Sequence, residues 1–208
     1  MMTSPESYYE MYLKGKTEKE ILTVIRRLKN EIGHLKNVME NPQYQSIVCP
    51  SEDVQLQCTR LYLEEAKKAL IEVGGVYKPS QAELKAQAFN NNISDIKEIE
   101  LSIGGYFGGY STYKIDLTNS DIKILFIPPI LSKEESKFIQ PQNDKTTFIE
   151  QLRDLNIGEW HNRYVNHNIL DGTQWHLNFY YNNNRSVKYY GSNAYPYNFK
   201  KLCDLFEI

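Results

Sequence analysis

The chain has 208 residues, of which 41% are hydrophobic and 24% are charged, as in a folded globular protein and unlike a disordered chain. Lys and Arg total 24 against 26 Asp and Glu, so the net charge of -2 excludes a general attraction to nucleic acid or to an anionic membrane. No apolar stretch approaches the roughly 18 residues of a transmembrane helix, and the first residues lack a secretory signal pattern, so we expect a cytoplasmic protein.

Residues 1–90 have the periodicity of a helical domain. Ser4 begins a short helix that Gly15 ends. Thr17 and Glu20 then form a capping-box pattern ahead of a long helix. Its apolar residues recur at alternating spacings of four and three, as in a coiled-coil seam: Ile21, Ile25, Leu28, Ile32, Leu35 and Met39.

This seam covers only about three heptads before Pro42, which favours an antiparallel hairpin within one chain over a long dimeric coil. The predicted partner helix spans residues 51–73 and ends at Gly74. We expect its buried stripe, with Leu70 at the edge, to contain Val54, Cys58, Leu61, Tyr62, Ala66, Ala69 and Val73. A further short helix over residues 80–89 completes the domain.

Residues 91–208 read as an antiparallel sheet with packed helices, because after the polar run at residues 90–92 the apolar residues alternate along the chain. Strands are expected at residues 99–103, 113–117, 122–127, 175–181 and 185–190, and helices at residues 146–155 and near the C-terminus. The predicted fold class is therefore α+β, with an N-terminal antiparallel helical hairpin or bundle followed by this sheet domain.

Three groups of sequence are specific as a set: YYEMYLKGKTEKEI with IRRLKNEIGHLKN, then SIGGYFGGYSTY, then IGEWHNRY with LDGTQWHLNFYYNNN and YYGSNAYPYNF. Together they resemble a family of uncharacterised cytosolic proteins from Gram-positive gut anaerobes, often associated with mobile elements. The resemblance covers nearly the whole chain and assigns no catalytic residue. It implies a setting in which counter-defence factors, anti-CRISPR inhibitors among them, and accessory nucleic-acid proteins are common.

One flank of the long predicted helix is basic. A rotation of about 100° per residue places Lys19, Arg26, Lys29 and Lys36 on one side of the apolar seam. Such cations suit the phosphates of RNA or the surface of a protein partner. The simpler interpretation is a solvated helix with ordinary charges.

The glycine-rich stretch at residues 104–109 has two interpretations. Its backbone N–H groups could approach a phosphate, but it lacks the GK[ST] ending of a P-loop and precedes a predicted strand. The simpler interpretation is a wide hairpin loop. That loop would expose Tyr106 and Phe107 as a stacking or partner-contact tip.

The densest group of acid, base and cationic side chains contains Glu159, His161, Arg163, His167 and His176. Two histidines could act as base and acid in metal-independent RNA cleavage, with Arg163 stabilising the phosphorane. A metal site from the three histidines and Glu159 would need spacings of six and nine, which match no standard motif, so we expect no metal and no cofactor. The simpler interpretation places His161 and His167 in a surface loop and His176 on the solvent face of a strand.

We therefore expect a non-enzymatic binding protein, an anti-CRISPR-like inhibitor of a nucleic-acid-guided nuclease. Its expected partners are a protein, namely a guided nuclease, and RNA, with no membrane contact; the pattern specifies no oligomeric state. The alternative is a metal-independent enzyme that cleaves guide or other RNA through the histidine group. A third interpretation is an interaction module of mobile elements without nucleic-acid contact.

Overall fold

The computed structural model describes residues 3–208, which form two compact units that divide between Pro79 and Ser80. The sequence predicted the division at residue 90 instead. The difference arises because the helix before residue 90 belongs to the second unit, where Phe89 packs edge-on against Phe179 with 5.1 Å between the ring centroids.

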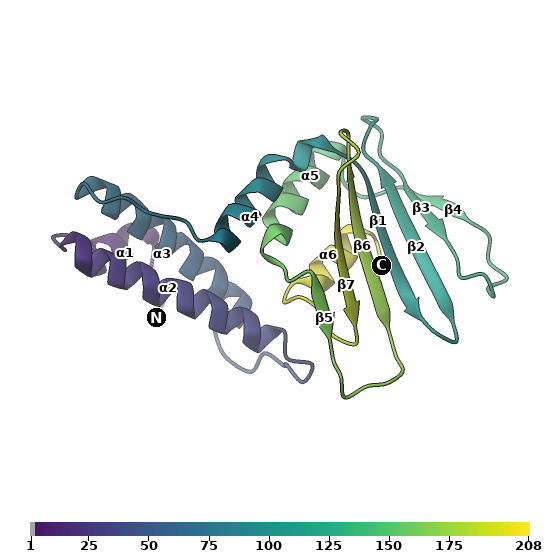
Figure 1. Ribbon diagram of the computed structural model, residues 1–208, viewed down its shortest axis with the longest axis horizontal. Coiled ribbons are helices and arrows are strands. Elements are labelled where there is room, and N and C mark those ends of the chain that lie inside the picture. Colours follow the sequence, from purple (N-terminus) through teal and green to yellow (C-terminus); the bar gives the residue numbers. More distant parts are fainter. Residues whose placement is uncertain (1–2) are drawn as a thin grey trace. The chain divides into compact units, whose positions relative to one another are not determined.

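The first unit contains α1 (Pro5–Tyr12), α2 (Glu18–Met39) and α3 (Glu52–Glu72). Helices α2 and α3 pack as an antiparallel hairpin, which confirms the prediction from the seam (Figure 1). The seam residues Ile21, Ile25, Leu28 and Leu35 are buried, and Ile32 and Met39 are half-buried. The predicted capping box of α2, between Thr17 and Glu20, is also present.

The predicted stripe of α3 is wrong for several residues. Val54 and Leu61 are 43% and 52% exposed, and Val73 is exposed as well. The buried residues instead recur at spacings of three and four: Leu56, Thr59, Leu63, Ala66 and Leu70. Apolar side chains occur on several sides of this helix, and the stripe that packs is the one in which three leucines repeat at heptad spacing.

Tyrosines fix α1 to the hairpin. The ring of Tyr8 stacks on that of Tyr62 with 4.1 Å between centroids, and Arg27 donates a hydrogen bond to the Tyr8 hydroxyl at 3.1 Å. The Tyr62 hydroxyl donates to the carbonyl of Thr3 at 2.7 Å. The chain has 16 tyrosines, and these two serve the packing of the first unit.

The second unit contains the whole sheet and three α-helices. In chain order its elements are α4 (Gln81–Asn91), β1 (Ile96–Gly105), β2 (Gly109–Asp116), β3 (Ile124–Ile127), β4 (Lys137–Ile139), α5 (Lys145–Asp154), β5 (Arg163–Val165), β6 (Gln174–Tyr181), β7 (Ser186–Ser192) and α6 (Phe199–Leu205). Single 3-10 turns lie at Ile93–Asp95 and Ile157–Glu159. The predicted α+β class is confirmed. Strands β4 and β5 were not predicted, because each has only three residues and so shows no alternation of apolar and polar positions.

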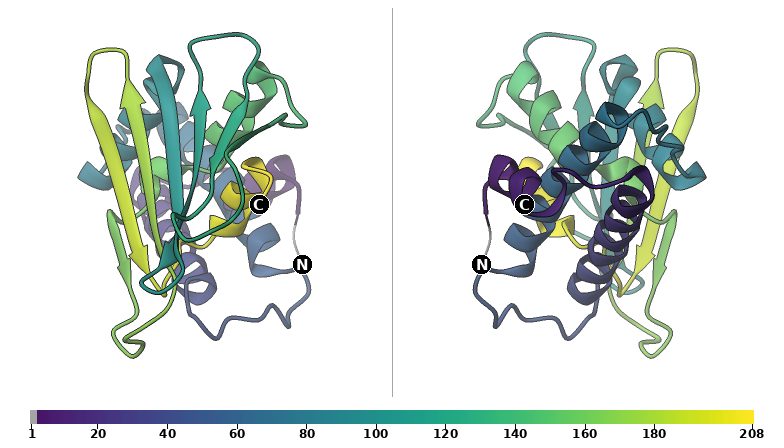
Figure 2. Two further views of the ribbon diagram at one scale, coloured as in Figure 1. Left: turned by 90° about the vertical axis from the view of Figure 1, so that its right-hand side faces the viewer. Right: turned by 90° about the vertical axis from the view of Figure 1, so that its left-hand side faces the viewer.

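The seven strands form one sheet in the order β4-β3-β2-β1-β6-β7-β5, antiparallel except for the pair of β5 and β7. Helices α4, α5 and α6 lie on one side of this sheet (Figure 2). Alternate strand residues such as Leu101, Leu177 and Phe179 point to that side and are fully buried. No helix of residues 80–208 covers the other side, which we call the open face.

Candidate functional site

Three connections meet at one end of the sheet. Because β1 is antiparallel to β2 and to β6, and β2 is antiparallel to β3, strands β1 and β3 end where β6 begins. The turn at residues 106–108, the β3–β4 connection at residues 128–136 and the β5–β6 connection at residues 166–173 therefore share this end (Figure 1). We call it the three-loop end.

Glycines allow these loops to approach one another closely. A Cβ atom on Gly105 would lie 2.8 Å from the carbonyl oxygen of Gly172, and one on Gly109 would lie 3.1 Å from the Cβ of Pro129. Gly109 also has a φ of +74°, a conformation that disfavours other residues. Gly104 pairs with Tyr110 in the strand ladder, so the glycine-rich stretch is a tight hairpin. The glycines of this stretch allow the hairpin to pack closely against the other two loops.

The three-loop end exposes large apolar side chains. Tyr106 and Phe107 are 86% and 78% exposed, and their rings pack edge-on with 5.3 Å between centroids. The other two loops add side chains of the same kind, with Ile130 and Leu170 almost fully exposed. We define the apolar patch as Tyr106, Phe107, Ile130, Leu131, Ile169 and Leu170.

The charges around the apolar patch are mixed and mostly acidic. Lys133 is the only Lys or Arg in the three loops as bounded above, whereas Glu134, Glu135 and Asp171 carry negative charge. An apolar centre with a polar, mixed-charge rim is the composition of a protein interface. The acidic rim is unfavourable for a phosphate-rich surface.

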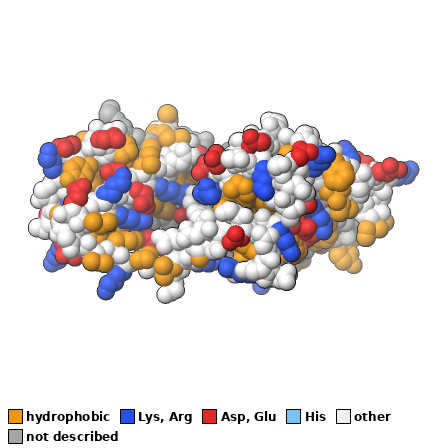
Figure 3. Space-filling view, turned by 90° about the horizontal axis from the view of Figure 1, so that it is seen from above, with side chains coloured by type: hydrophobic (Ala, Val, Ile, Leu, Met, Phe, Trp, Pro, Cys, Tyr) orange, Lys and Arg blue, Asp and Glu red, His pale blue; other side chains and the backbone are white. Residues whose placement is uncertain are grey.

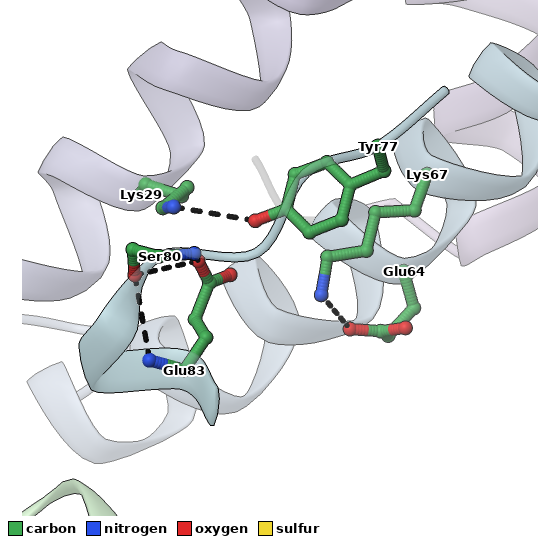
Figure 4. Close-up of polar contacts among 6 residues, drawn as sticks. All are labelled: Lys29, Glu64, Lys67, Tyr77, Ser80 and Glu83. Carbon is green, nitrogen blue, oxygen red and sulfur yellow. Dashed lines mark hydrogen bonds and ion pairs between the residues drawn. The ribbon is translucent and has the colours of Figure 1, made fainter. Parts of the chain in front are cut away.

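The predicted basic flank of α2 divides into two kinds of residue. Lys19 and Arg26 are exposed, whereas Lys29 and Lys36 are half-buried. Lys29 donates a hydrogen bond from Nζ to the Tyr77 hydroxyl at 3.2 Å (Figure 4). Lys29 therefore helps to hold the segment after α3.

Tyr77 is also close to a second lysine, because Lys67 Nζ lies 5.0 Å from its ring centroid and pairs with Glu64 at 2.8 Å. The tyrosine joins α2 and α3 through these two cations. On the face drawn in Figure 3, Lys and Arg side chains are interspersed with Asp and Glu in both units.

The three predicted histidines lie in different surroundings. His161 follows the second 3-10 turn, and its backbone N–H donates to the Tyr164 hydroxyl at 3.0 Å. His167 lies in the β5–β6 connection, and His176 lies on β6. No hydrogen bond or ring contact joins these three imidazoles within residues 3–208. Over the same residues no three His, Cys, Asp or Glu side chains are placed to hold a metal ion.

Arg163 and His176 do share a surface, the open face, while Glu159 lies in the 3-10 turn before β5. In the ladder His176 stands opposite Tyr190, and Tyr190 stands opposite Arg163. The imidazole centroid is 5.0 Å from the Tyr190 ring and 5.9 Å from the Tyr110 ring. Burial by these neighbours lowers the pKa of His176, so the imidazole is neutral at pH 7.

We call Tyr110, His176 and Tyr190 the aromatic strip. Arg163 extends it, with the guanidinium 5.9 Å from the Tyr190 ring centroid. At the other end the Tyr110 hydroxyl donates to Gln174 Oε1 at 2.6 Å, across Gly104 in the strand between them. Sequence alternation placed His176 on the solvent side of its strand but gave no sign of Tyr110 and Tyr190, because it does not reveal which strands are neighbours.

The acidic side chain closest to the strip in the ladder is neutralised. Glu100, one row away on β1, forms an ion pair with Lys114 at 2.6 Å. Asn178 donates a hydrogen bond to the same carboxylate at 3.1 Å. The strip itself contains no carboxylate, and its nearest cation is Arg163, although the charge of Glu100 still acts on His176.

Comparison with known proteins gives no match: no family model fits the sequence, and no curated protein or solved structure is significantly similar to it. Within residues 3–208 no helix combines the length and apolar character needed to cross a membrane.

Proposed function

We propose that this protein is a non-enzymatic binding protein that docks its apolar patch into an apolar groove of another protein. The observation that carries this proposal is the gathering of exposed apolar side chains from three separate loops at one end of the sheet. Monomeric proteins rarely expose contiguous apolar areas of this kind without a partner. The loops project from a rigid sheet, which positions them before binding.

The patch contributes an area on the scale of an interface centre. Two exposed aromatic rings offer on the order of 300 Å² of contact area, and the four aliphatic side chains enlarge it. A stable interface buries about 800 Å² on each partner, so the patch and its polar rim together reach that scale. Tyr106 and Phe107 have the side-chain types and the exposure of central anchor residues.

The proposed partner is a nucleic-acid-guided nuclease, so that the protein acts in the cytoplasm as an anti-CRISPR-like inhibitor. This part of the proposal rests on the resemblance to mobile-element proteins and on the patch, whose acidic rim suits the basic surfaces with which such nucleases hold nucleic acid. RNA cleavage does not form part of the proposal, because the histidines that it would need are not brought together.

A reconstituted cleavage assay tests this function. A guide-loaded Cas9-type nuclease is mixed with labelled target DNA and with wild-type protein, the Tyr106→Ala/Phe107→Ala variant, or the control Ile47→Ala/Ile71→Ala. The control removes apolar side chains that are 89% and 67% exposed and lie outside the patch. We expect inhibition by the wild type and the control, and a loss of about tenfold or more in inhibitory potency for the patch variant.

Equal inhibition by both double variants would show that the patch is not the docking surface. Unchanged cleavage across representative guided nucleases would contradict the inhibitor role itself. Labelled guide RNA incubated with the protein alone, with and without EDTA, separates binding from catalysis. Cleaved guide RNA in that control would replace the binding function with an RNA-cleaving one.

A further inference from the structure

The open face carries an aromatic row that the hydrophobic core does not use. His176 and Tyr190 point away from the buried side of the sheet, since their strand neighbours Trp175 and Tyr189 are buried. Tyr110 lies on the same side, because its ring contacts that of His176. Their rings follow one another from β2, over the intervening strand β1, to β6 and β7, with centroid separations of 5.9 and 5.0 Å. No helix of residues 80–208 covers it (Figure 2).

We propose that the aromatic strip binds single-stranded RNA, with bases stacked on its rings and Arg163 contacting the phosphate backbone. An open sheet face with aromatic side chains on adjacent strands is a general solution for stacking unpaired bases. The guanidinium beside Tyr190 adds a fixed positive charge at one end of the row. This inference concerns a different surface from the apolar patch and stands independently of the proposed nuclease partner.

The chemistry of the strip fits a nucleic acid better than a protein. Around the rings lie amide and hydroxyl groups, from Gln174, Ser102 and Thr112, in place of the aliphatic side chains that fill a protein interface centre. The nearby carboxylate of Glu100 is paired with Lys114, which reduces its repulsion of phosphates. A duplex does not suit the strip, because its paired bases are inaccessible for stacking.

The charges on the open face limit where a bound RNA strand can lie. Glu98 and Asp116 stand opposite each other in the ladder of β1 and β2. On the open face they lie two rows beyond His176, on the side away from the three-loop end. Their charges disfavour a phosphate backbone there. The RNA is therefore placed across the strands, near the three-loop end, and only two or three bases contact the strip.

Ribose is favoured over deoxyribose by the polar groups beside the strip. The hydroxyls of Ser102 and Thr112 lie 2.9 Å apart on neighbouring strands, next to His176 in the ladder. Gln174 accepts from Tyr110 and retains its amide N–H groups as donors. Hydroxyl and amide groups at this position can bond to a ribose 2′-OH, which DNA lacks.

Fluorescence anisotropy with a labelled mixed-sequence RNA decamer tests the proposal. Tyr190→Ala should weaken binding by roughly 5- to 150-fold, since one stacked base is lost, whereas Tyr190→Phe should bind like the wild type. Tyr180→Ala is the matched control, because Tyr180 lies on the same face but beside Glu98. Arg163→Gln should weaken binding and reduce the salt slope by about 0.7, the value for one phosphate contact on a single strand.

Three results would overturn the inference. They are the absence of RNA binding by the wild type, equal effects of Tyr190→Ala and Tyr180→Ala, and equal or tighter binding of a DNA decamer of the same sequence. Arg163 is exposed, so Arg163→Gln keeps the test valid if Tyr190→Ala fails to fold. RNA binding by Tyr106→Ala/Phe107→Ala should equal that of the wild type, which separates this inference from the proposed nuclease inhibition.

Discussion

Trp175 lies across Gly191 on the neighbouring strand, with the indole occupying the space where a side chain at position 191 would stand. The two residues are directly opposite in the ladder of β6 and β7. Trp175 is fully buried, and its Nε1 donates a hydrogen bond to the carbonyl of Ala194 at 2.9 Å. The packing of the core therefore depends on a glycine in the strand that also carries Tyr190.

Replacing Gly191 with Ala should destabilise the second unit, because the new methyl group collides with the Trp175 indole. We expect a loss of about 1 to 3 kcal/mol in the free energy of unfolding, the usual cost of overpacking, measured by urea denaturation. Gly33→Ala is the control: Gly33 lies within α2 with open space around it, so Ala should stabilise by about 0.5 to 1 kcal/mol. Equal stability of Gly191→Ala and the wild type would contradict this packing.

Helix α3 provides a second matched pair, in which the two side chains are identical and only burial differs. Leu63→Ala should lower the free energy of unfolding by about 2 to 5 kcal/mol, because Leu63 is buried against α2. Leu61→Ala should change it by less than about 0.5 kcal/mol, because Leu61 is exposed. A larger loss of stability for Leu61→Ala than for Leu63→Ala would support the buried stripe that the sequence pattern predicted.

This helix shows what could and could not be read from the sequence. The length and type of α2, α3 and the major strands followed from local spacing, since each pattern needs only the residues of its own element. Local spacing did not show which side of α3 is buried. Val54 and Leu61 are spaced to share one side of the helix, and Leu56 and Leu63 are equally well spaced to share another. The choice between them depends on the partner helix, which local spacing does not contain.

The functional surfaces were predictable only in part. The hairpin tip with Tyr106 and Phe107 was identified from the glycines that flank it. Its association with Ile130 and Leu170 requires the strand order, which places loops distant in sequence at one end of the sheet. The aromatic strip also could not be predicted without the strand order, because its members come from strands β2, β6 and β7.

Limited proteolysis should cut the β3–β4 connection, where residues 130–136 are all exposed, and the connection between α2 and α3, where residues 45–50 are exposed. The polar run at residues 90–92 favours a further cleavage site when the sequence is considered alone. We now expect protection there, because Ile93 is fully buried and the segment is helical. Mass spectrometry of early trypsin and thermolysin fragments identifies the sites, and early cleavage at residues 90–94 would contradict the packing of Phe89 and Ile93.

His176 gives a pH dependence whose sign is set by burial. Burial under Tyr110 and Tyr190 lowers the pKa of His176 below the ordinary value of 6.5, while the nearby charge of Glu100 opposes the shift. As the pH falls from above 6.5, the unfolded chain takes up a proton at this residue before the folded chain does. The contribution of His176 is therefore fully present above pH 6.5 and is lost as the pH falls toward its folded pKa.

The imidazole C2 proton, followed by NMR, should titrate at a lower pH in the folded protein than in urea. The decrease in stability between pH 7.5 and 5.5 should be smaller in His176→Gln than in the wild type, because glutamine removes the titrating group and keeps a polar side chain on the open face. A folded midpoint above 6.5 would show that Glu100, despite its ion pair with Lys114, outweighs burial. The folded imidazole would then carry more positive charge at a given pH than in the unfolded chain, and phosphate attraction would add to stacking at the centre of the aromatic strip.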